Sequence, residues 1–474
     1  MQFTILSHAG LLAEHNGVRL VCDPWLIGSC YWRSWWNFPE PDPALVENLA
    51  PQFIYLTHLH WDHFHGPSLK KLFSPKTTIL VPKVPTRRML QDLKWLGFSH
   101  VIEIPHGGRH RLGPDFELCS YQFGLTVDSA AVIRGGGYTL FNCNDAKFFG
   151  LPLKQVLNDF PKIDFIFRSH SSASPVPLCV ENHAKLLTAE NGGYDQAEQF
   201  ARCAIFTGAR YAVPFASNHC FLHAETRQFN ATATTPEVAR RRYASLAAET
   251  GAPTECVVMP PGSRWSDTGG FEIRPFDFGN RASYVEELLQ RKAPQLADNA
   301  GHEARVRADR DAFEAYFVRF LRAIPWAVRR WLLRPLVFRV REEAGTLLWL
   351  VDVSRCRITP IEHAPAGCVV FEVHAAVLND CARQRMFSVW TASKRIRIHL
   401  PAATALSQAN LWFALLDLYE VDMLPVWRNL SARAFAVRVR RWREPAELLA
   451  ILLRRMVKRE RFSVSRVYPL PRVR

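Results

Sequence analysis

Short apolar runs separated by turn residues fill the first 280 residues of the chain. The segment FTILSHAGLLAEHNGVRLVCD predicts two strands that meet at His15-Asn16-Gly17, because Asn-Gly readily adopts the backbone of a tight hairpin turn. Similar runs, rich in β-branched and aromatic residues, predict further strands. These cover residues 52–57, 78–81, 101–104, 116–122, 129–133, 138–142, 165–167, 211–214 and 256–259.

Apolar residues spaced three or four positions apart predict helices between these strands. The helical segments cover residues 67–72, 86–96, 153–158, 194–206 and 236–249. Both halves of the region contain a cluster of strands followed by helices. A sheet buries its apolar face against a second sheet or a layer of helices, so we expect two packed sheets with helices outside them.

The pattern changes after residue 282, where longer amphipathic segments begin. Helical periodicity at 307–333, 405–418 and 445–459 flanks strand-like runs at 346–353, 368–373, 386–391 and 395–399. The length of 474 residues also exceeds that of one compact domain. We therefore expect an α/β sandwich over residues 1–282 and a smaller α+β domain over residues 283–474, with the polar stretch 298–302 as a linker.

The net charge of +15 comes entirely from the last third of the chain. Residues 1–300 contain 28 Lys+Arg and 28 Asp+Glu, whereas residues 301–474 contain 31 and 16. This excess favours an anionic partner for the second domain: an acidic electron-transfer or carrier protein, a phosphorylated or nucleotide-linked substrate, nucleic acid or a membrane surface. A solvated arginine-rich surface explains it equally well. No nucleic-acid motif accompanies the arginines, which argues against sequence-specific binding.

The amphipathic, basic segment 445–459 is the candidate docking element within this charged region. It fits an acidic redox partner, a carrier protein or a membrane surface. The alternative is that it simply caps the second domain.

The sequence contains no apolar run long enough for a transmembrane segment and no signal-peptide pattern at its start. Its eleven cysteines are scattered and form no C-x-x-C pair. This pattern is typical of reduced thiols in a cytoplasmic protein. The sequence also has no C-x-H partnered with a later C-x-x-H, which excludes an iron–sulfur cluster of the Rieske type within it.

The stretch YLTHLHWDHFHG, residues 55–66, carries the clearest chemistry. His58, His60, Asp62 and His63 form the pattern H-x-H-x-D-H directly after a predicted strand. Alternate residues of an extended segment point to one side, so the first two histidines can hold one ion, and a turn can direct Asp62 and His63 to a second ion. Imidazole and carboxylate ligands suit iron, zinc or manganese. A purely structural cluster would need hydrogen-bond partners for five polar side chains in one turn, these four and His65.

Three stretches of the sequence resemble the metallo-β-lactamase superfamily. They are THLHWDH, SHAGLLAEHNGVRLVCDPWL and TLFNCNDAK. The resemblance implies an αββα sandwich with two divalent metal ions and makes Asp145 the ligand that bridges them. By the same comparison Asp23 is a structural residue or one that supports a ligand.

Within that superfamily the chain is most similar to the hydroxylase of CMP-N-acetylneuraminic acid and its bacterial relatives. The similarity is carried by CDPWLIGSCYWRSWWNFPEP at 22–41, ARYAVPFASNHCFLHAET at 209–226 and VVMPPGSRWSD at 257–267. Those hydroxylases have a Rieske domain, which this sequence lacks. The resemblance therefore implies an external electron donor.

The pattern departs from the superfamily at the first metal site. The third histidine, expected within residues 120–128, is missing. Gln122, Asp128 or His170 are the candidates to replace it, unless the enzyme is mononuclear. The last ligand of the second site is His219 or His223. Two groups of histidines are expected to play no ligand role: His8 and His65 as buried neighbours, His106 and His110 as structural or exposed residues.

The tryptophans around the motif, above all Trp35 and Trp36, are candidates for the aromatic wall of a substrate pocket. Arg264 and Lys147 are candidates to bind an anionic group of the substrate. Ordinary core packing explains the tryptophans and a salt bridge explains either cation. The similarity to a sugar-nucleotide hydroxylase implies a polar, anionic metabolite.

Three functions remain in competition. The favoured one is an iron-dependent, diiron oxygenase, with Asp62 and Asp145 as catalytic ligands. The second is a hydrolase of an ester, lactone, amide or phosphodiester that uses a metal-bound hydroxide, with Asp62 free as a general base. The third is a non-catalytic metal-binding module with an incomplete site.

Overall fold

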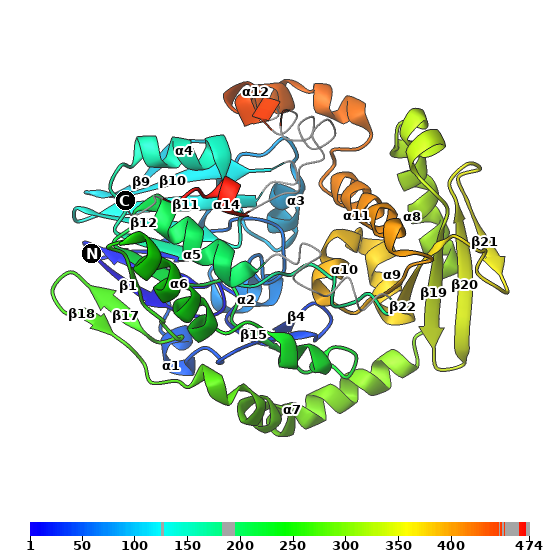
Figure 1. Ribbon diagram of the computed structural model, residues 1–474, viewed down its shortest axis with the longest axis horizontal. Helices are drawn as coiled ribbons and strands as arrows, with labels where there is room; N and C mark the ends of the chain where they lie inside the picture. Colours follow the sequence, from blue (N-terminus) through cyan, green and yellow to red (C-terminus); the bar gives the residue numbers. More distant parts are fainter. Residues whose placement is uncertain (125–127, 183–194, 445, 448–449, 451–463, 471–474) are drawn as a thin grey trace.

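The computed structural model describes residues 1–124, 128–182, 195–444, 446–447, 450 and 464–470. Its first part contains two large sheets that lie face to face, and its second part contains a separate five-stranded sheet with its own helices (Figure 1).

The first sheet has eight strands in the order β18-β17-β1-β2-β3-β6-β7-β8. The strands are β1 (Gln2–Ile5), β2 (Leu11–His15), β3 (Val18–Cys22), β6 (Phe53–Tyr55), β7 (Thr78–Pro82), β8 (Val101–Ile104), β17 (Arg264–Ser266) and β18 (Gly270–Glu272). The predicted hairpin at His15-Asn16-Gly17 joins β2 and β3, with Asn16 and Gly17 both at positive φ. The first predicted strand, however, is interrupted between Ile5 and Leu11 by a tight turn.

The second sheet has the order β16-β14-β13-β12-β11-β10-β9. Its strands are β9 (Gly108–Gly113), β10 (Phe116–Phe123), β11 (Asp128–Gly135), β12 (Tyr138–Asn144), β13 (Phe165–Arg168), β14 (Tyr211–Pro214) and β16 (Glu255–Cys256). Side chains alternate between its faces as strand geometry requires. Ala131 and Ile133 join the core between the sheets, whereas Ala130 and Val132 pack on the opposite side against helices.

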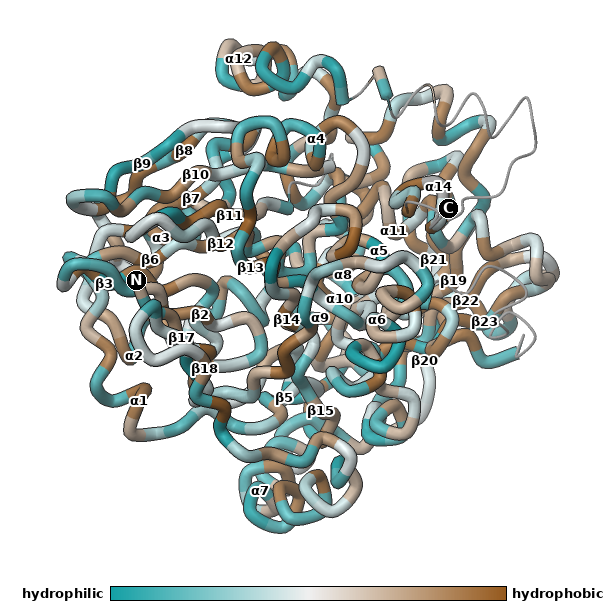
Figure 2. The backbone as a smooth tube through the Cα atoms, turned by 60° about the vertical axis from the view of Figure 1, so that its left-hand side comes forward, coloured by the Kyte–Doolittle hydropathy of each residue, from teal (hydrophilic) through white to brown (hydrophobic). Residues whose placement is uncertain are grey.

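Helices cover the outer faces of both sheets. α2 (Gly66–Leu72) and α3 (Arg88–Trp95) pack on the first sheet, and α4 (Gly150–Asp159), α5 (Gln196–Thr207) and α6 (Pro236–Thr250) pack on the second. The predicted αββα sandwich is therefore confirmed. Figure 2 shows brown, hydrophobic backbone at β14, which lies between β16 and β13 in the second sheet. This colour agrees with the burial of Ala212 and Val213.

The second domain is of the predicted α+β class. Its sheet has the order β21-β20-β19-β22-β23. The strands are β19 (Leu336–Glu342), β20 (Gly345–Asp352), β21 (Arg357–Ile361), β22 (Val369–His374) and β23 (Arg397–His399), and the helices include α8 (Arg310–Ala323), α9 (Ala375–Gln384), α10 (Phe387–Ser393), α11 (Leu406–Glu420) and α12 (Ala432–Arg440).

Two segments of this domain differ from the sequence-based expectation, and a third cannot be compared with it. Residues 387–391 lie in α10 and not in the predicted strand. A short run of Phe, Val, Trp and Thr favours a strand locally and is too short for its periodicity to distinguish a strand from a helix. The helix predicted over 307–333 ends at Ala323, since Pro325 cannot continue it. Most of the predicted helix 445–459 lies outside the described residues.

The two domains are joined by α7 (Arg281–Ala304), which runs along the lower side of Figure 1. The proposed boundary at 282/283 falls in its first turn, and the stretch 298–302 forms its last turns instead of a loose linker. After the second domain the chain returns to the sandwich. There the Tyr468 hydroxyl donates to the Phe148 carbonyl over 2.6 Å and accepts a bond from Arg168.

Candidate metal centre

The candidate ligands gather where neighbouring strands end. The motif follows β6, Asp145 follows β12, His170 follows β13, and His219 begins the short strand β15 (His219–Phe221) after β14. Strands β12, β13 and β14 are parallel neighbours, so the residues that follow them emerge at one edge of the sheet. Open α/β sheets commonly bind their ligands at this edge.

One group of possible ligands consists of His58, His60 and Asp145, whose ligand atoms all lie within 4.8 Å of one another. The His58 Nε2 atom is 2.9 Å from His60 Nδ1 and 3.7 Å from Asp145 Oδ2. The residues therefore face one point, as the H-x-H pattern predicts.

A second group consists of His8, Asp62 and His63. Asp62 Oδ2 lies 3.0 Å from His8 Nε2 and 3.4 Å from His63 Nε2. Asp145 Oδ1 is 3.5 Å from His63 Nε2, so this carboxylate reaches both groups. That position fits the bridging role implied by the family resemblance.

Several of these atoms are buried without a hydrogen-bond partner in the described structure. They are both ring nitrogens of His8, His63 Nε2, Asp145 Oδ1 and His219 Nδ1. A buried polar atom without a partner is costly, and metal ions at the two groups would satisfy those atoms that face them, including one nitrogen of each ligand histidine. The carboxylates around His63 also favour a cation. Burial alone would lower the pKa of His63, but Asp145, Asp62 and Asp23 hold this pKa well above its usual range. The residues present therefore fit divalent metal ions.

Asp23 orients this second group from behind. Its Oδ2 atom lies 2.8 Å from His63 Nδ1 and accepts a 2.7 Å hydrogen bond from Thr57 Oγ1. Its Oδ1 atom accepts from the Thr57 amide. Since Nδ1–H donates a hydrogen bond to this carboxylate, the Nε2 lone pair of His63 is directed at Asp62 and Asp145. Such a bond is the usual support for a metal-binding histidine.

Tyr31 supports Asp62 from the other side, because its hydroxyl donates to Asp62 Oδ1. Tyr31, Trp32 and Arg33 all adopt positive φ values, of 55°, 53° and 59°. Residues with a Cβ enter this region at a cost, and such strain often marks functional sites. The second domain holds this turn: Trp32 Nε1 donates to Asp380, and the Trp32 carbonyl accepts from Arg395.

The candidates for the missing ligand occupy three different places. Asp128 faces His60 and Asp145, and burial together with Asp145 raises its pKa to about 6. Gln122 donates within the sheet, to the Ile104 carbonyl and Ser120. His170 is fully buried, and neither of its ring nitrogens has a partner among the described residues. Burial, with smaller effects of Lys147 and His8, lowers its pKa to about 3.

His219 and His223 are separated by the fold. The His219 ring stacks on Trp35, with centroids 3.5 Å apart, and lies 5.4 Å from the His8 ring. His223 instead lies 3.3 Å from Glu303 on α7 and is not brought to either ligand group. His65 caps α2 through Ser68. Sequence reasoning treated His8 and Asp23 only as neighbours and did not single out Tyr31. The one available signal for His8 was its place in the Ser-His-Ala-Gly turn at a strand end.

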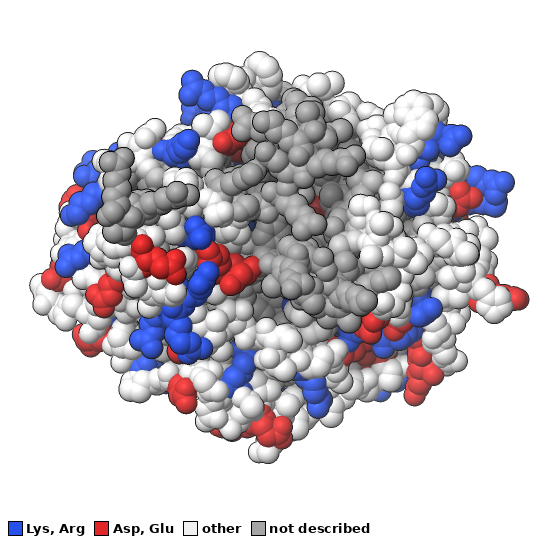
Figure 3. Space-filling model, viewed as in Figure 1, with Lys and Arg blue, Asp and Glu red and all other residues white. Residues whose placement is uncertain are grey.

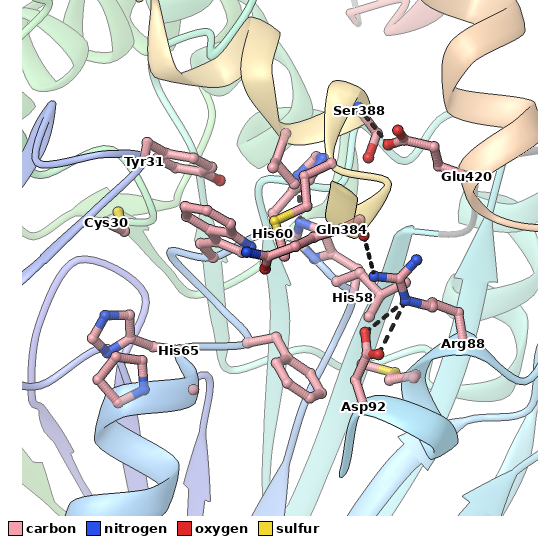
Figure 4. A pocket seen from close by; sticks show the side chains of 18 of the residues that line it. Cys30, Tyr31, His58, His60, His65, Arg88, Asp92, Gln384, Ser388 and Glu420 are labelled. Atoms are coloured by element: carbon pink, nitrogen blue, oxygen red, sulfur yellow. Dashed lines mark hydrogen bonds and ion pairs between the residues drawn. The ribbon is translucent and has the colours of Figure 1, made fainter. Parts of the chain in front are cut away.

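A cavity of about 1140 Å³ opens in front of His58 and His60, between the two domains. Tyr31, Trp32 and Trp61 line one side, with the Tyr31 and Trp61 rings stacked 5.8 Å apart. Gln384, Ser388 and Glu420 of the second domain lie on the other side (Figure 4).

Of the tryptophans predicted to form an aromatic wall, Trp32 and Trp61 line this cavity, whereas Trp35 and Trp36 do not. The candidate cations Arg264 and Lys147 do not line it either. Trp36 is buried in the core near α7, and Arg264 pairs with Glu272 on the exposed surface of β17. Lys147 is buried and donates to the Ser171 carbonyl. The cavity wall instead carries Asp417, whose pKa is raised to about 8 by burial and by nearby Glu420 and Asp128.

Sequence relatives match part of this chain. A putative Rieske 2Fe-2S iron-sulfur protein of Mycolicibacterium smegmatis is 28% identical over 324 residues, which cover 63% of this chain and 61% of that protein. The cytidine monophosphate-N-acetylneuraminic acid hydroxylase of Mus musculus is 28% identical over 151 residues, or 31% of this chain and 26% of the hydroxylase. This chain thus spans about three fifths of the length of the first relatives it matches. No protein-family model matches it.

Solved structures similar to this chain include a metallo-β-lactamase fold protein and a diiron β-hydroxylase. YhfI from Bacillus subtilis, a metallo-β-lactamase fold protein, is 13% identical, with 56% of this chain and 98% of its own covered and a TM-score of 0.38. CmlA, a diiron β-hydroxylase from Streptomyces venezuelae, is 16% identical, with 56% and 53% covered and a TM-score of 0.37. Because these scores are low, the description of the fold rests on the two packed sheets and the position of the motif.

Proposed function

We propose that this protein is a diiron oxygenase that hydroxylates a metabolite held in the cavity between its domains. The observation that carries the proposal is the pair of adjoining ligand groups that share Asp145, at the wall of a cavity large enough for a metabolite. The names of the sequence relatives, a hydroxylase and a Rieske protein, support oxygen chemistry over hydrolysis.

In this proposal His58, His60 and Asp145 hold one ion, and His8, Asp62, His63 and Asp145 hold the other. Asp128 completes the first position and His219 the second. His170, whose ring nitrogens have no partner among the described residues, remains the alternative to Asp128. When bound, iron would supply activation of dioxygen, whereas zinc would supply a hydroxide for hydrolysis.

The remaining residues prepare the site. Asp23 fixes which nitrogen of His63 is free, and the Tyr31 hydroxyl occupies one oxygen of Asp62 so that the other faces the ligand group. The stacked Tyr31 and Trp61 rings shield the site from water and offer a flat surface to the substrate. Hydroxylation consumes two electrons, so we propose an iron–sulfur protein or domain outside this sequence as their source.

Metal analysis of the full chain purified without added metal, with an optical spectrum recorded in air, tests the proposal. We expect two irons per chain and a visible ligand-to-metal absorption band. Zinc alone, with turnover of a chromogenic ester, would establish the hydrolase instead. If no metal is bound after reconstitution with iron, zinc or manganese, only the third function remains, a non-catalytic protein with an incomplete metal site.

Asp145→Ala tests the shared ligand in the same experiment. Because Asp145 reaches both groups, its loss should remove both ions. Asp298→Ala, which removes an exposed carboxylate on α7, is the matched control and should keep them. Full metal content in Asp145→Ala would exclude the bridging role.

A further inference from the structure

The end of the second domain carries an unusual exposed surface. Between residues 426 and 442, six large apolar side chains are 51% to 81% exposed. They are Val426, Trp427, Leu430, Phe435, Val439 and Trp442. We call these six residues the apolar ridge. Scattered exposed apolar residues are normal, but a cluster of this size indicates an interaction site.

The ridge is a stable feature of the fold and not a helix that failed to pack. On α12, Ala434 and Val437 are buried, whereas Phe435 and Val439 lie four positions apart on the opposite side, and Trp442 is exposed in the turn that follows the helix. Arg433 anchors the helix to the sandwich through the Val84 carbonyl and Glu103, over 2.9 Å and 2.8 Å. The helix is therefore oriented with its apolar side outward.

Arginines flank the ridge. Arg438, Arg440 and Arg443 are exposed and form no ion pair within the described part of the chain. Lys and Arg are grouped beside α12 at the upper edge of the molecule in Figure 3, and Figure 2 shows brown and teal turns alternating along this helix. Residues 426–474 contain 14 Lys+Arg and 3 Asp+Glu, which is most of the net charge of the protein.

We propose that the apolar ridge and its flanking arginines dock the protein onto an anionic lipid surface. Trp and Phe prefer the headgroup region of a bilayer, and arginines beside them bind lipid phosphates. The 14 Lys+Arg against 3 Asp+Glu of residues 426–474 complement an anionic surface, and a bilayer accommodates exposed aromatic side chains without a separate pocket for each. None of the described helices is long and apolar enough to cross a membrane, so the contact would be peripheral.

Co-sedimentation of the full chain with vesicles tests this docking. We expect binding at low salt to vesicles of phosphatidylcholine that contain phosphatidylglycerol, and much weaker binding to phosphatidylcholine alone. Phe435→Glu/Trp442→Glu should weaken binding by about tenfold or more, because it removes inserted side chains and adds repulsion. Arg438→Glu/Arg440→Glu should weaken it by a similar factor.

Ile273→Glu is the matched control, since Ile273 is 43% exposed next to β18, far from α12 in Figure 1, and its substitution should leave binding unchanged. Thermal unfolding of each variant identifies any that fail to fold. No sedimentation of the wild-type chain, or equal sedimentation of both ridge variants, would overturn the proposal. So would loss of binding in the arginine variant alone, since that result means adsorption without insertion. Binding of an acidic protein without binding of vesicles would identify a protein-docking site instead.

Discussion

Asp23 and His63 illustrate how one residue prepares another for metal binding. The two residues are 40 positions apart, yet their side chains meet at 2.8 Å in a fully buried environment. A neutral imidazole has one proton and one lone pair, so the acceptor at Nδ1 decides that Nε2 is the free ligand atom. The histidine motif alone leaves this choice open.

Replacing Asp23 with Asn should therefore impair the site without removing a ligand. The amide can donate to Nδ1, which moves the proton to Nε2 and disables His63 as a ligand. We expect metal affinity to fall by about 10- to 100-fold, measured by competition with a chelator. The control is Asp298→Asn, at an exposed position on α7, and an affinity equal to wild type in Asp23→Asn would contradict the orienting role.

The turn between β1 and β2 is the element that delivers His8 to the site. The Leu6 amide donates to the Gly10 carbonyl over 2.7 Å, and the Gly10 amide donates to Ser7 Oγ over 3.2 Å. A Cβ on Gly10 would lie 2.4 Å from Ser7 Oγ and 3.1 Å from Leu6 Cβ. Only glycine closes this turn without displacing its neighbours, and the turn places His8 next to Asp62.

Alanine substitutions at two glycines should consequently have opposite effects. Gly10→Ala should lower the free energy of unfolding by about 1–3 kcal/mol, because the site is already closely packed. Gly301→Ala should raise it by about 0.5–1 kcal/mol, because Gly301 lies within α7 with open space around it. Urea denaturation measures both.

Ser7→Ala/Gly10→Ala provides the check on the proposed clash. Removing the Ser7 hydroxyl should recover part of the loss, although it also removes the bond to the Gly10 amide. A double variant as unstable as the sum of its single changes would show that the turn is not limited by this contact.

At the scale of the whole molecule, Arg395 connects the domains. Its side chain is fully buried and donates to both Glu303 oxygens over 2.7 Å and to Glu225 over 2.7 Å. Glu225 belongs to the sandwich, Glu303 to α7 and Arg395 to the second domain. Burial alone would raise the pKa of Glu225, but Arg395 and Arg341 lower this pKa to about 2. Because Arg395 also bonds the Trp32 carbonyl, the same contact fixes the cavity wall.

Arg395→Met should therefore destabilise the protein at neutral pH by about 3–5 kcal/mol, because it leaves buried Glu303 without its arginine and half-buried Glu225 with Arg341 alone. A folded-state pKa below the unfolded value means that ionisation favours folding. This contribution is complete above about pH 4.3 and is lost as the pH falls through about 2. The difference between wild type and variant should shrink over that range, as urea denaturation at several pH values would measure.

Arg264→Met is the control for this prediction, because Arg264 also pairs with a glutamate but on an exposed surface. It should leave the free energy of unfolding unchanged at every pH. A cost of Arg395→Met that stayed constant with pH would mean that lost packing, and not the ion pairs, accounts for it.

The sequence by itself determined the local features of this protein. The two-residue alternation along segments such as 129–133 predicted strands, and Asn16-Gly17 predicted the hairpin, since both signals are carried by neighbouring residues. The H-x-H-x-D-H spacing after a strand likewise brought His58 and His60 together. Local spacing failed at 386–391, where a short run of strand-favouring residues forms most of a helix.

Only the tertiary structure decided what surrounds the motif. His8, Tyr31, Asp128 and His219 reach it from other strand ends and loops, and the spacing along the chain says nothing about which of them arrive. The same applies to the second domain, which closes the cavity and holds the strained turn at Tyr31 through Arg395 and Asp380. The physical reason is that local conformation depends on neighbouring residues, whereas a binding site depends on how distant segments pack around one core.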